Sequence, residues 1–279
     1  PQRRRLVQHL MDVVVLRRLE DLILKDVPGF RVAFKDQSRL MKVLGFLMYP
    51  FNPKFMDTFT TTLGNTVYFP TRAYYEDHVE HSFRTLAHEY VHLWDAKQSS
   101  WFNLSYAFPQ VLAVLPFLGF GVLAWPHSWL LLISVIGYVI AAFVARRSLI
   151  GFWATFGFAV ALTFTLSVLL TGWATLALVG GLAFLAPWPG PWRTHWELRG
   201  YTMTIAVKLW LGDTLDTKRR DHIVEHFLGS AYYFMSWTRP AIEAKVDEAI
   251  RQATAGELQE NAPFARICEL LYQQSILRR

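Results

Sequence analysis

The chain has 279 residues, of which 53% are hydrophobic and 18% are charged, and its formal net charge is +6. Ordinary soluble proteins carry roughly 25% charged residues, so this composition points toward contact with lipid. The basic residues are not interleaved with aromatic side chains as in a single-strand groove, and we therefore expect no nucleic-acid partner. The single cysteine, Cys268, excludes an internal disulfide and a cysteine-based metal site.

The first third of the chain, residues 1–97, mixes polar and apolar positions and predicts a small unit of helices and strands. Gly64-Asn65 separates two strand-like runs and predicts a β-hairpin turn. We expect the second strand of this hairpin, which ends at Pro70, to be an edge strand. In chain order the expected elements are a helix over 3–26, a strand over 30–34, a helix over 37–48, hairpin strands over 57–62 and 66–69, and a helix over 82–98.

The middle third, residues 98–192, contains only two charged side chains, Arg146 and Arg147. A membrane-spanning helix needs about 20 apolar residues, so each uncharged run beside this pair is long enough for two short spans. Turns at Pro126-His127 and Thr171-Gly172 favour four spans, and two long segments with re-entrant portions are the alternative. The four expected spans cover about 107–125, 128–145, 149–170 and 173–188.

The last third, residues 193–279, predicts a helical C-terminal part with helices over about 193–211, 218–236, 239–255 and 257–277. The chain therefore divides into an N-terminal part over 1–97, transmembrane helical hairpins over 98–192 and a C-terminal part over 193–279.

A metal-binding pattern, His-Glu-x-x-His, lies at His88, Glu89 and His92. Positions i and i+4 of a helix share one face, so both imidazoles can reach a single metal ion. Glu89 follows His88 directly on the helix. There it can act as a general base on a metal-bound water without binding the metal itself. The residues beside the two histidines are uncharged, as is typical of a helix buried in a cleft.

This part of the chain resembles the small bacterial gluzincins, which are zincin metallopeptidases. The resemblance lies in the order of the elements, namely a hairpin, a strand ending in proline and then the segment T-L-A-H-E-Y-V-H. The resemblance covers about residues 55–100 and a short stretch near residue 197. Apolar spans after the motif are similar to the membrane zinc endopeptidases of the heat-shock and prenyl-protein-processing type, although those also have spans before it. The resemblance implies an α+β fold, in which a zincin-like catalytic domain is interrupted by a transmembrane insertion of about four spans.

A catalytic zinc needs a third protein ligand, for which Glu197 is the best candidate. It follows the apolar region and opens a helix, as the ligand glutamate of gluzincins does. Two alternatives stay open, because Thr194 and Glu197 also fit a capping box and His195 could replace Glu197 as the ligand. Many gluzincins place an aspartate four residues after the ligand glutamate to orient the first histidine, and that position is Tyr201 here.

Other side chains are candidates for supporting or competing roles. Asp95 lies on the ligand face and is a candidate acceptor for the second nitrogen of a ligand imidazole. Tyr201 or Arg199 is a candidate donor to the oxyanion, from proximity to Glu197. A second motif, His222-Ile223-Val224-Glu225-His226, matches the inverted zincin pattern and competes as a metal site.

These patterns predict a membrane-embedded zinc metallopeptidase in which Zn²⁺ activates water and Glu89 transfers its proton. An extended peptide or protein substrate, membrane-tethered ones included, would add as a strand to the edge at Val67, Tyr68 and Phe69. The expected spans predict a multi-pass membrane protein. The positive-inside rule predicts that its catalytic face is cytoplasmic. The alternative is a non-catalytic, membrane-anchored structural component of a larger assembly, such as a cell-envelope complex or a virion, which retains a zincin fold.

Overall fold

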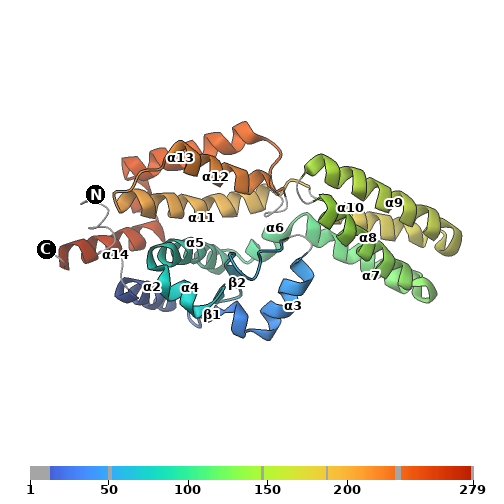
Figure 1. The fold of residues 1–279 in the computed structure, drawn as a ribbon, viewed down its shortest axis with the longest axis horizontal. Helices are drawn as coiled ribbons and strands as arrows, with labels where there is room; N and C mark the ends of the chain where they lie inside the picture. Colours follow the sequence, from blue (N-terminus) through green and yellow to red (C-terminus); the bar gives the residue numbers. More distant parts are fainter. Residues whose placement is uncertain (1–12, 50–51, 146–147, 187, 230–233, 278–279) are drawn as a thin grey trace.

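The computed structural model describes residues 13–49, 52–145, 148–186, 188–229 and 234–277. Two bodies follow one another along the long axis of the molecule (Figure 1). The mixed body combines residues 13–107 with residues 191–277, and the apolar bundle contains the helices between them. The start of the expected first helix and the arginines at 3–5 and 146–147 lie outside the described residues.

A three-stranded sheet forms one side of the mixed body, in the order β1 (Arg31–Phe34), β3 (Thr66–Phe69), β2 (Thr61–Leu63). The expected hairpin is present, because β2 pairs antiparallel to β3 and Gly64 takes a φ of 57° in the turn. However, β1 pairs in parallel with the other side of β3. The prediction that Val67, Tyr68 and Phe69 form an edge strand is therefore wrong, and β2 is the edge of the hairpin.

The helices of the mixed body pack around one central helix, α5 (Val79–Gln98), which lies between α11 (Pro191–Trp210) on one face and α2 (Val13–Asp26) on the other. Its apolar side chains fill the core, and Phe83, Leu86, Ala87, Tyr90 and Val91 are fully buried. The remaining helices of this body are α3 (Arg39–Met48), α4 (Arg72–Asp77), α6 (Phe102–Ala107), α12 (Thr217–Leu228), α13 (Arg239–Ala255) and α14 (Phe264–Leu277), with short 3-10 turns at Lys35–Gln37 and Glu257–Glu260.

The apolar bundle consists of α7 (Val114–Leu123), α8 (Trp129–Ala145), α9 (Leu149–Thr171) and α10 (Ala174–Leu185). Helix α8 packs against α9, and α10 packs against α7. Aromatic rings fill one of its cores, where Tyr138 contacts Phe152 and Phe156. Gly172 ends α9 with a φ of 54°, at the turn that the sequence predicts.

The prediction of four membrane spans is wrong. Among the described residues, only Ile150–Thr171 is long and apolar enough to cross a membrane, judged by length and composition. The other apolar helices are shorter, and α10, for example, has 12 residues and a length of about 18 Å against a hydrocarbon core of about 30 Å. The fold is thus mostly helical with one small sheet, and not an α+β domain with four transmembrane spans. The lengths of the helices therefore do not support a protein that crosses the membrane several times.

Candidate metal centre

The two histidines of the motif lie on one face of α5 and point to the same spot. His88 and His92 are both buried, and their Nε2 atoms are 3.1 Å apart. One helical turn separates them, which is why their rings converge. Two ring nitrogens at this distance could both contact one cation.

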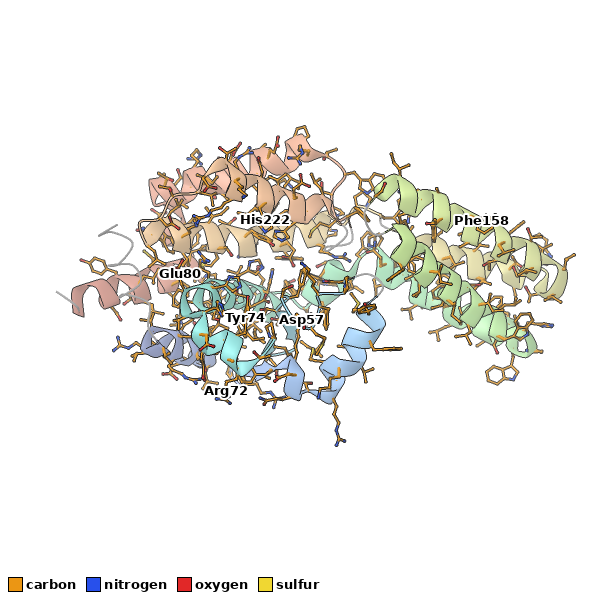
Figure 2. All side chains as sticks on the ribbon, viewed as in Figure 1. Asp57, Arg72, Tyr74, Glu80, Phe158 and His222 are labelled. Atoms are coloured by element: carbon orange, nitrogen blue, oxygen red, sulfur yellow. The ribbon has the colours of Figure 1, made fainter. Side chains whose placement is uncertain are left out.

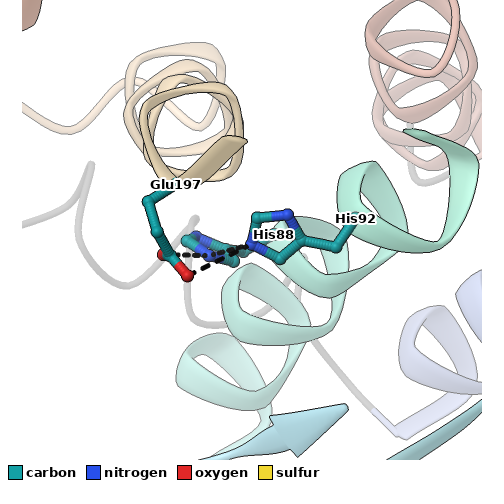
Figure 3. Close-up of side chains that lie close together, drawn as sticks. All are labelled: His88, His92 and Glu197. Atoms are coloured by element: carbon teal, nitrogen blue, oxygen red, sulfur yellow. Dashed lines mark hydrogen bonds and ion pairs between the residues drawn. The ribbon is translucent and has the colours of Figure 1, made fainter. Parts of the chain in front are cut away.

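Glu197 completes the group from α11 (Figure 3). Its Oε2 lies 3.5 Å from Nε2 of His88, and its Oε1 lies 3.8 Å from Nε2 of His92. Helix α11 begins at Pro191, so Glu197 lies in its second turn. The capping-box alternative is therefore excluded, and Thr194 instead donates its hydroxyl to the carbonyl of Met235.

The spacing of the three side chains suits a tetrahedral zinc ion. Zinc bonds of about 2.0–2.1 Å place neighbouring ligand atoms about 3.3–3.4 Å apart in a tetrahedron. The two imidazole nitrogens are 3.1 Å apart, and each has a different oxygen of Glu197 at 3.5 or 3.8 Å. In addition, Oε2 of Glu197 is buried without a hydrogen-bond partner, which is costly unless another group, such as a cation, satisfies it.

The charge states of Glu197 and His92 also suit a cation. Burial alone would raise the pKa of Glu197, but the His88 and His92 imidazoles and the Tyr106 hydroxyl outweigh it and hold that pKa at about 2. Burial lowers the pKa of His92, which favours the neutral imidazole that a metal requires. Burial also acts to lower the pKa of His88, but Glu197 and Glu89 outweigh it and raise that pKa.

Two residues that the sequence analysis did not single out contact the ligands directly. The hydroxyl of Tyr106, from α6, donates a hydrogen bond to Oε1 of Glu197. The hydroxyl of Thr204 lies 3.3 Å from Nδ1 of His88. Thr204 follows Glu197 by seven positions, about two helical turns. The helical repeat therefore places both residues on one face of the helix, and this spacing could have indicated Thr204. No spacing in the sequence indicates Tyr106.

A glycine permits the close approach of the two ligand helices. Gly200 on α11 faces the His88 ring, and a Cβ at that position would lie 2.5 Å from Nε2 of His88. Such a distance is far inside van der Waals contact. The backbone of α11 can therefore reach the imidazole only because this side chain is absent.

Asp95 and Arg199 take roles other than the predicted ones. The guanidinium of Arg199 donates two hydrogen bonds of 2.8 Å to the carboxylate of Asp95. Asp95 thus joins α5 to α11 and does not accept from a ligand imidazole, and Nδ1 of His92 has no hydrogen-bond partner within the described part of the chain. Arg199 is occupied by this ion pair, which leaves Tyr201 as the remaining candidate for the oxyanion.

Glu89 faces an open cleft of about 990 Å³ beside the ligand group. Its Oε2 accepts a hydrogen bond of 2.6 Å from the hydroxyl of Thr62 on strand β2. The cleft is bounded by segment 54–60, α5, α11 and α12, and Figure 2 labels three of its lining residues, Tyr74, Glu80 and His222. Tyr201 also lines it and meets the His88 ring edge-on at 5.0 Å.

The inverted motif lines the same cleft without forming a metal site of three ligands. The rings of His222 and His226 lie 4.4 Å apart, and His226 stacks on Tyr201. Glu225 turns away and pairs with Arg239. Within the described ranges, the group of His88, His92 and Glu197 is the one place where three such ligands meet, and His195 is not part of it.

Comparison of the chain with protein families, with curated proteins and with solved structures gives no match. The interpretation of the site therefore rests on its own geometry.

Proposed function

We propose that the protein is a zinc-dependent metallopeptidase of the gluzincin type, attached to a membrane through its apolar bundle. The convergence of His88, His92 and Glu197 at zinc-sized separations supports this proposal. Glu197 lies more than 100 positions from both histidines in the chain, and helices α5 and α11 bring the three residues together. Such a donor set, two nitrogens and one carboxylate, is typical of catalytic zinc sites that keep one position open.

Bound zinc would supply a Lewis acid and lower the pKa of its water toward about 7. The residues of the chain would then move the proton. Because Thr62 holds Oε2 of Glu89, the other carboxylate oxygen can take a proton from the attacking water and return it to the leaving amine. Tyr201 lines the cleft beside His88 and is placed to donate to the developing oxyanion.

The substrate would lie along β2 and not along β3 as the sequence suggested. An extended peptide can add as a strand to an exposed sheet edge through main-chain hydrogen bonds. Strand β2 offers that edge, and its central residue, Thr62, contacts Glu89. A peptide bound there would pass directly by the general base.

The surface of the apolar bundle supports attachment to lipid. Tryptophan side chains lie at both ends of α9, where aromatic belts of membrane proteins lie. Near its start, the Trp153 ring contacts those of Trp188 and Trp237, and beyond its end Trp173 is 87% exposed. Helix α9 has 23 residues, about 34 Å, which matches a hydrocarbon core of about 30 Å.

Metal analysis combined with a cleavage assay tests the proposal. We would purify the full chain in nanodiscs and measure bound zinc and cleavage of a mixed peptide library by mass spectrometry. The wild type should bind one zinc ion per chain and cleave peptides, Glu89→Gln should keep the zinc and lose cleavage, and His92→Ala should lose both. Zinc without any Glu89-dependent cleavage would favour the non-catalytic structural alternative, and a wild type that binds no zinc would refute the zinc metallopeptidase.

A further inference from the structure

Helix α3 exposes an apolar face that the rest of the structure leaves uncovered. Leu40, Val43 and Phe46 follow one another at intervals of three positions, which places them along one side of the helix. They are 48%, 58% and 81% exposed, respectively. Tyr49, directly after the helix, is also exposed. A surface of this kind usually marks a contact with a protein or a membrane.

The opposite side of α3 is firmly packed, so the exposed face has a defined orientation. Met41 is fully buried, and Gly45 faces Met56 so closely that a Cβ there would lie 2.6 Å from the sulfur. Ser38 caps the first turn by accepting a hydrogen bond from the backbone N–H of Met41. The helix is therefore a fixed part of the mixed body, and its apolar face is presented outward.

The charge of α3 suits an anionic membrane surface. The helix carries two basic residues, Arg39 and Lys42, and no acidic residue. Both are exposed, and neither forms a salt bridge with the residues that the structure describes. Basic residues flanking an apolar helical face are typical of helices that lie in the interface of anionic bilayers.

The position of α3 agrees with this environment. Along the long axis of the molecule, its C-terminal end lies at the junction between the mixed body and the apolar bundle (Figure 1). The tryptophan contacts of Trp153, Trp188 and Trp237 join residues at the same end of α9. If the apolar bundle lies in the bilayer, the membrane surface therefore lies at the level of α3.

We propose that α3 inserts its Leu40–Val43–Phe46 face into the interfacial layer of an anionic lipid bilayer. This inference rests on the membrane attachment in the proposed function and is independent of zinc and of peptide cleavage. Because the C-terminal end of α3 lies at the junction with the bundle, one bilayer could contact both.

Insertion of α3 would fix one wall of the cleft at the membrane surface. The segment after α3 lines the cleft through Lys54, Thr58, Phe59 and Thr60. Two contacts tie this segment to the helix region, since Nζ of Lys35 donates a hydrogen bond of 2.6 Å to the carbonyl of Phe55 and Met56 packs on Gly45. Peptides tethered to the same membrane surface would then reach the cleft without leaving it.

Spin labels attached to single cysteines test this placement in the intact protein. In a Cys268→Ser background, we would label Phe46→Cys on α3, Phe158→Cys on α9 and Lys218→Cys on α12. The protein would be studied in nanodiscs of phosphatidylcholine and phosphatidylglycerol, with oxygen as the lipid-soluble relaxant and a nickel chelate as the water-soluble one. We expect the labels at positions 46 and 158 to be relaxed more by oxygen, and the label at 218 more by nickel.

Three results would overturn the inference, and they have different meanings. A position-46 label as accessible to nickel as the label at 218, with position 158 in lipid, would place α3 in water. A label at 46 shielded from both relaxants would show that protein covers α3. A label at 158 in water would refute the membrane attachment itself. Val43→Cys should repeat the result at position 46, and a circular dichroism spectrum equal to that of the wild type would show that each variant is folded.

Discussion

Glu89, the general base of the proposed mechanism, is held by a hydrogen bond from a residue on another element. Thr62 donates its hydroxyl from the edge strand to one carboxylate oxygen, across 27 positions of sequence. A carboxylate that is held on one side loses rotational freedom, and its second oxygen is then directed consistently. The same strand is the edge at which the proposed substrate would bind, so one element would serve both substrate binding and proton transfer.

The contribution of Thr62 can be measured by substitution. Thr62→Val keeps the shape of the side chain and removes the donor, and a hydrogen bond to a charged group is worth about 1.5–3 kcal/mol. We expect kcat for peptide cleavage to fall by roughly 10- to 100-fold while KM and zinc content stay near the wild-type values. Thr62→Ser should restore most of the rate. Equal kcat values for the valine variant and the wild type would show that Thr62 does not position Glu89.

Lys35 is a fully buried lysine whose ammonium group donates a hydrogen bond to the carbonyl of Phe55. Burial lowers the pKa of its ammonium group to about 8, although the carboxylate of Glu89 acts in the opposite direction. The folded state disfavours the protonated form of Lys35. The resulting loss of folding stability is fully present below pH 8. It is relieved as the pH rises from about 8 toward the ordinary lysine value near 10.5.

We therefore expect the melting temperature of the wild type to rise relative to that of Lys35→Met between pH 8 and 10. Thermal unfolding followed by circular dichroism at several pH values measures this difference. Lys218→Met removes an exposed lysine and should show no such trend against the wild type. A pH-independent difference for Lys35→Met would mean that Lys35 does not titrate in this range.

The sequence was informative about some residues of the site and uninformative about others. His88, Glu89 and His92 follow from the periodicity of a single helix, and Glu197 from its position after the apolar region. Thr62 and Tyr106 contact Glu89 and Glu197 from elements 27 and 91 positions away. Such contacts depend on how the elements pack. The spacing of residues within one helix does not encode that packing.

At the scale of elements, the site depends on how α5 and α11 approach each other. Gly200 allows the helices to come close at His88, and the ion pair of Asp95 with Arg199 fastens them on the other side of the ligands. Both features lie within five positions of a ligand. The spacing of the two helices thus sets the distance between Glu197 and the imidazoles.

Gly200→Ala should disrupt this spacing. The added methyl group would lie 2.5 Å from Nε2 of His88, so the ring or the helix must move. We expect zinc affinity to fall by about 10- to 100-fold or more, the range found when groups that orient metal ligands are lost. Alanine is a better helix former than glycine, so a weakened helix cannot explain such a loss. Competition titration with a zinc chelator measures the affinity.

Gly119→Ala is the matched control, because Gly119 lies in α7 and a Cβ there meets nothing within 4 Å. This variant should bind zinc like the wild type. Unchanged zinc affinity in Gly200→Ala would show that α5 and α11 can separate without cost and that the close contact has no role in the site.

The wrong predictions from the sequence concern how the strands pair and where the apolar helices begin. The turn at Gly64-Asn65 predicts the hairpin, but no local signal shows that β1 pairs in parallel with β3, since parallel partners are far apart in sequence. Likewise, the apolar runs over 98–145 and 148–192 are long enough for two spans each, but hydropathy does not fix where each helix begins. The 3-10 turns at Gln110–Ala113 and Trp125–His127 shorten the regular helix beside them.

At the scale of the whole molecule, zinc would connect two chain segments that the apolar bundle separates. The histidines precede the bundle and Glu197 follows it, so the ion would cross-link the two halves of the mixed body. A ligand that binds only the folded state stabilises it by mass action. The metal should therefore act as a structural clamp as well as a catalyst.

Zinc should raise the melting temperature of the metal-stripped protein. At a zinc concentration 100 times the dissociation constant, the stabilisation is about 2.7 kcal/mol, which corresponds to roughly 5–10 °C for a domain of this size. Differential scanning fluorimetry with and without zinc measures the shift, and His92→Ala should show none. A shift of equal size in that variant would assign the stabilisation to zinc bound elsewhere.

The division of the site between two chain segments also bears on when hydrolysis can begin. A nascent chain that ends before residue 197 contains both imidazoles and Glu89 but lacks the last ligand. Since chains are made from the N-terminus, the apolar bundle leaves the ribosome before the site can close. In the proposed enzyme, delivery to lipid would thus precede the first cleavage, and neighbouring nascent proteins would be spared.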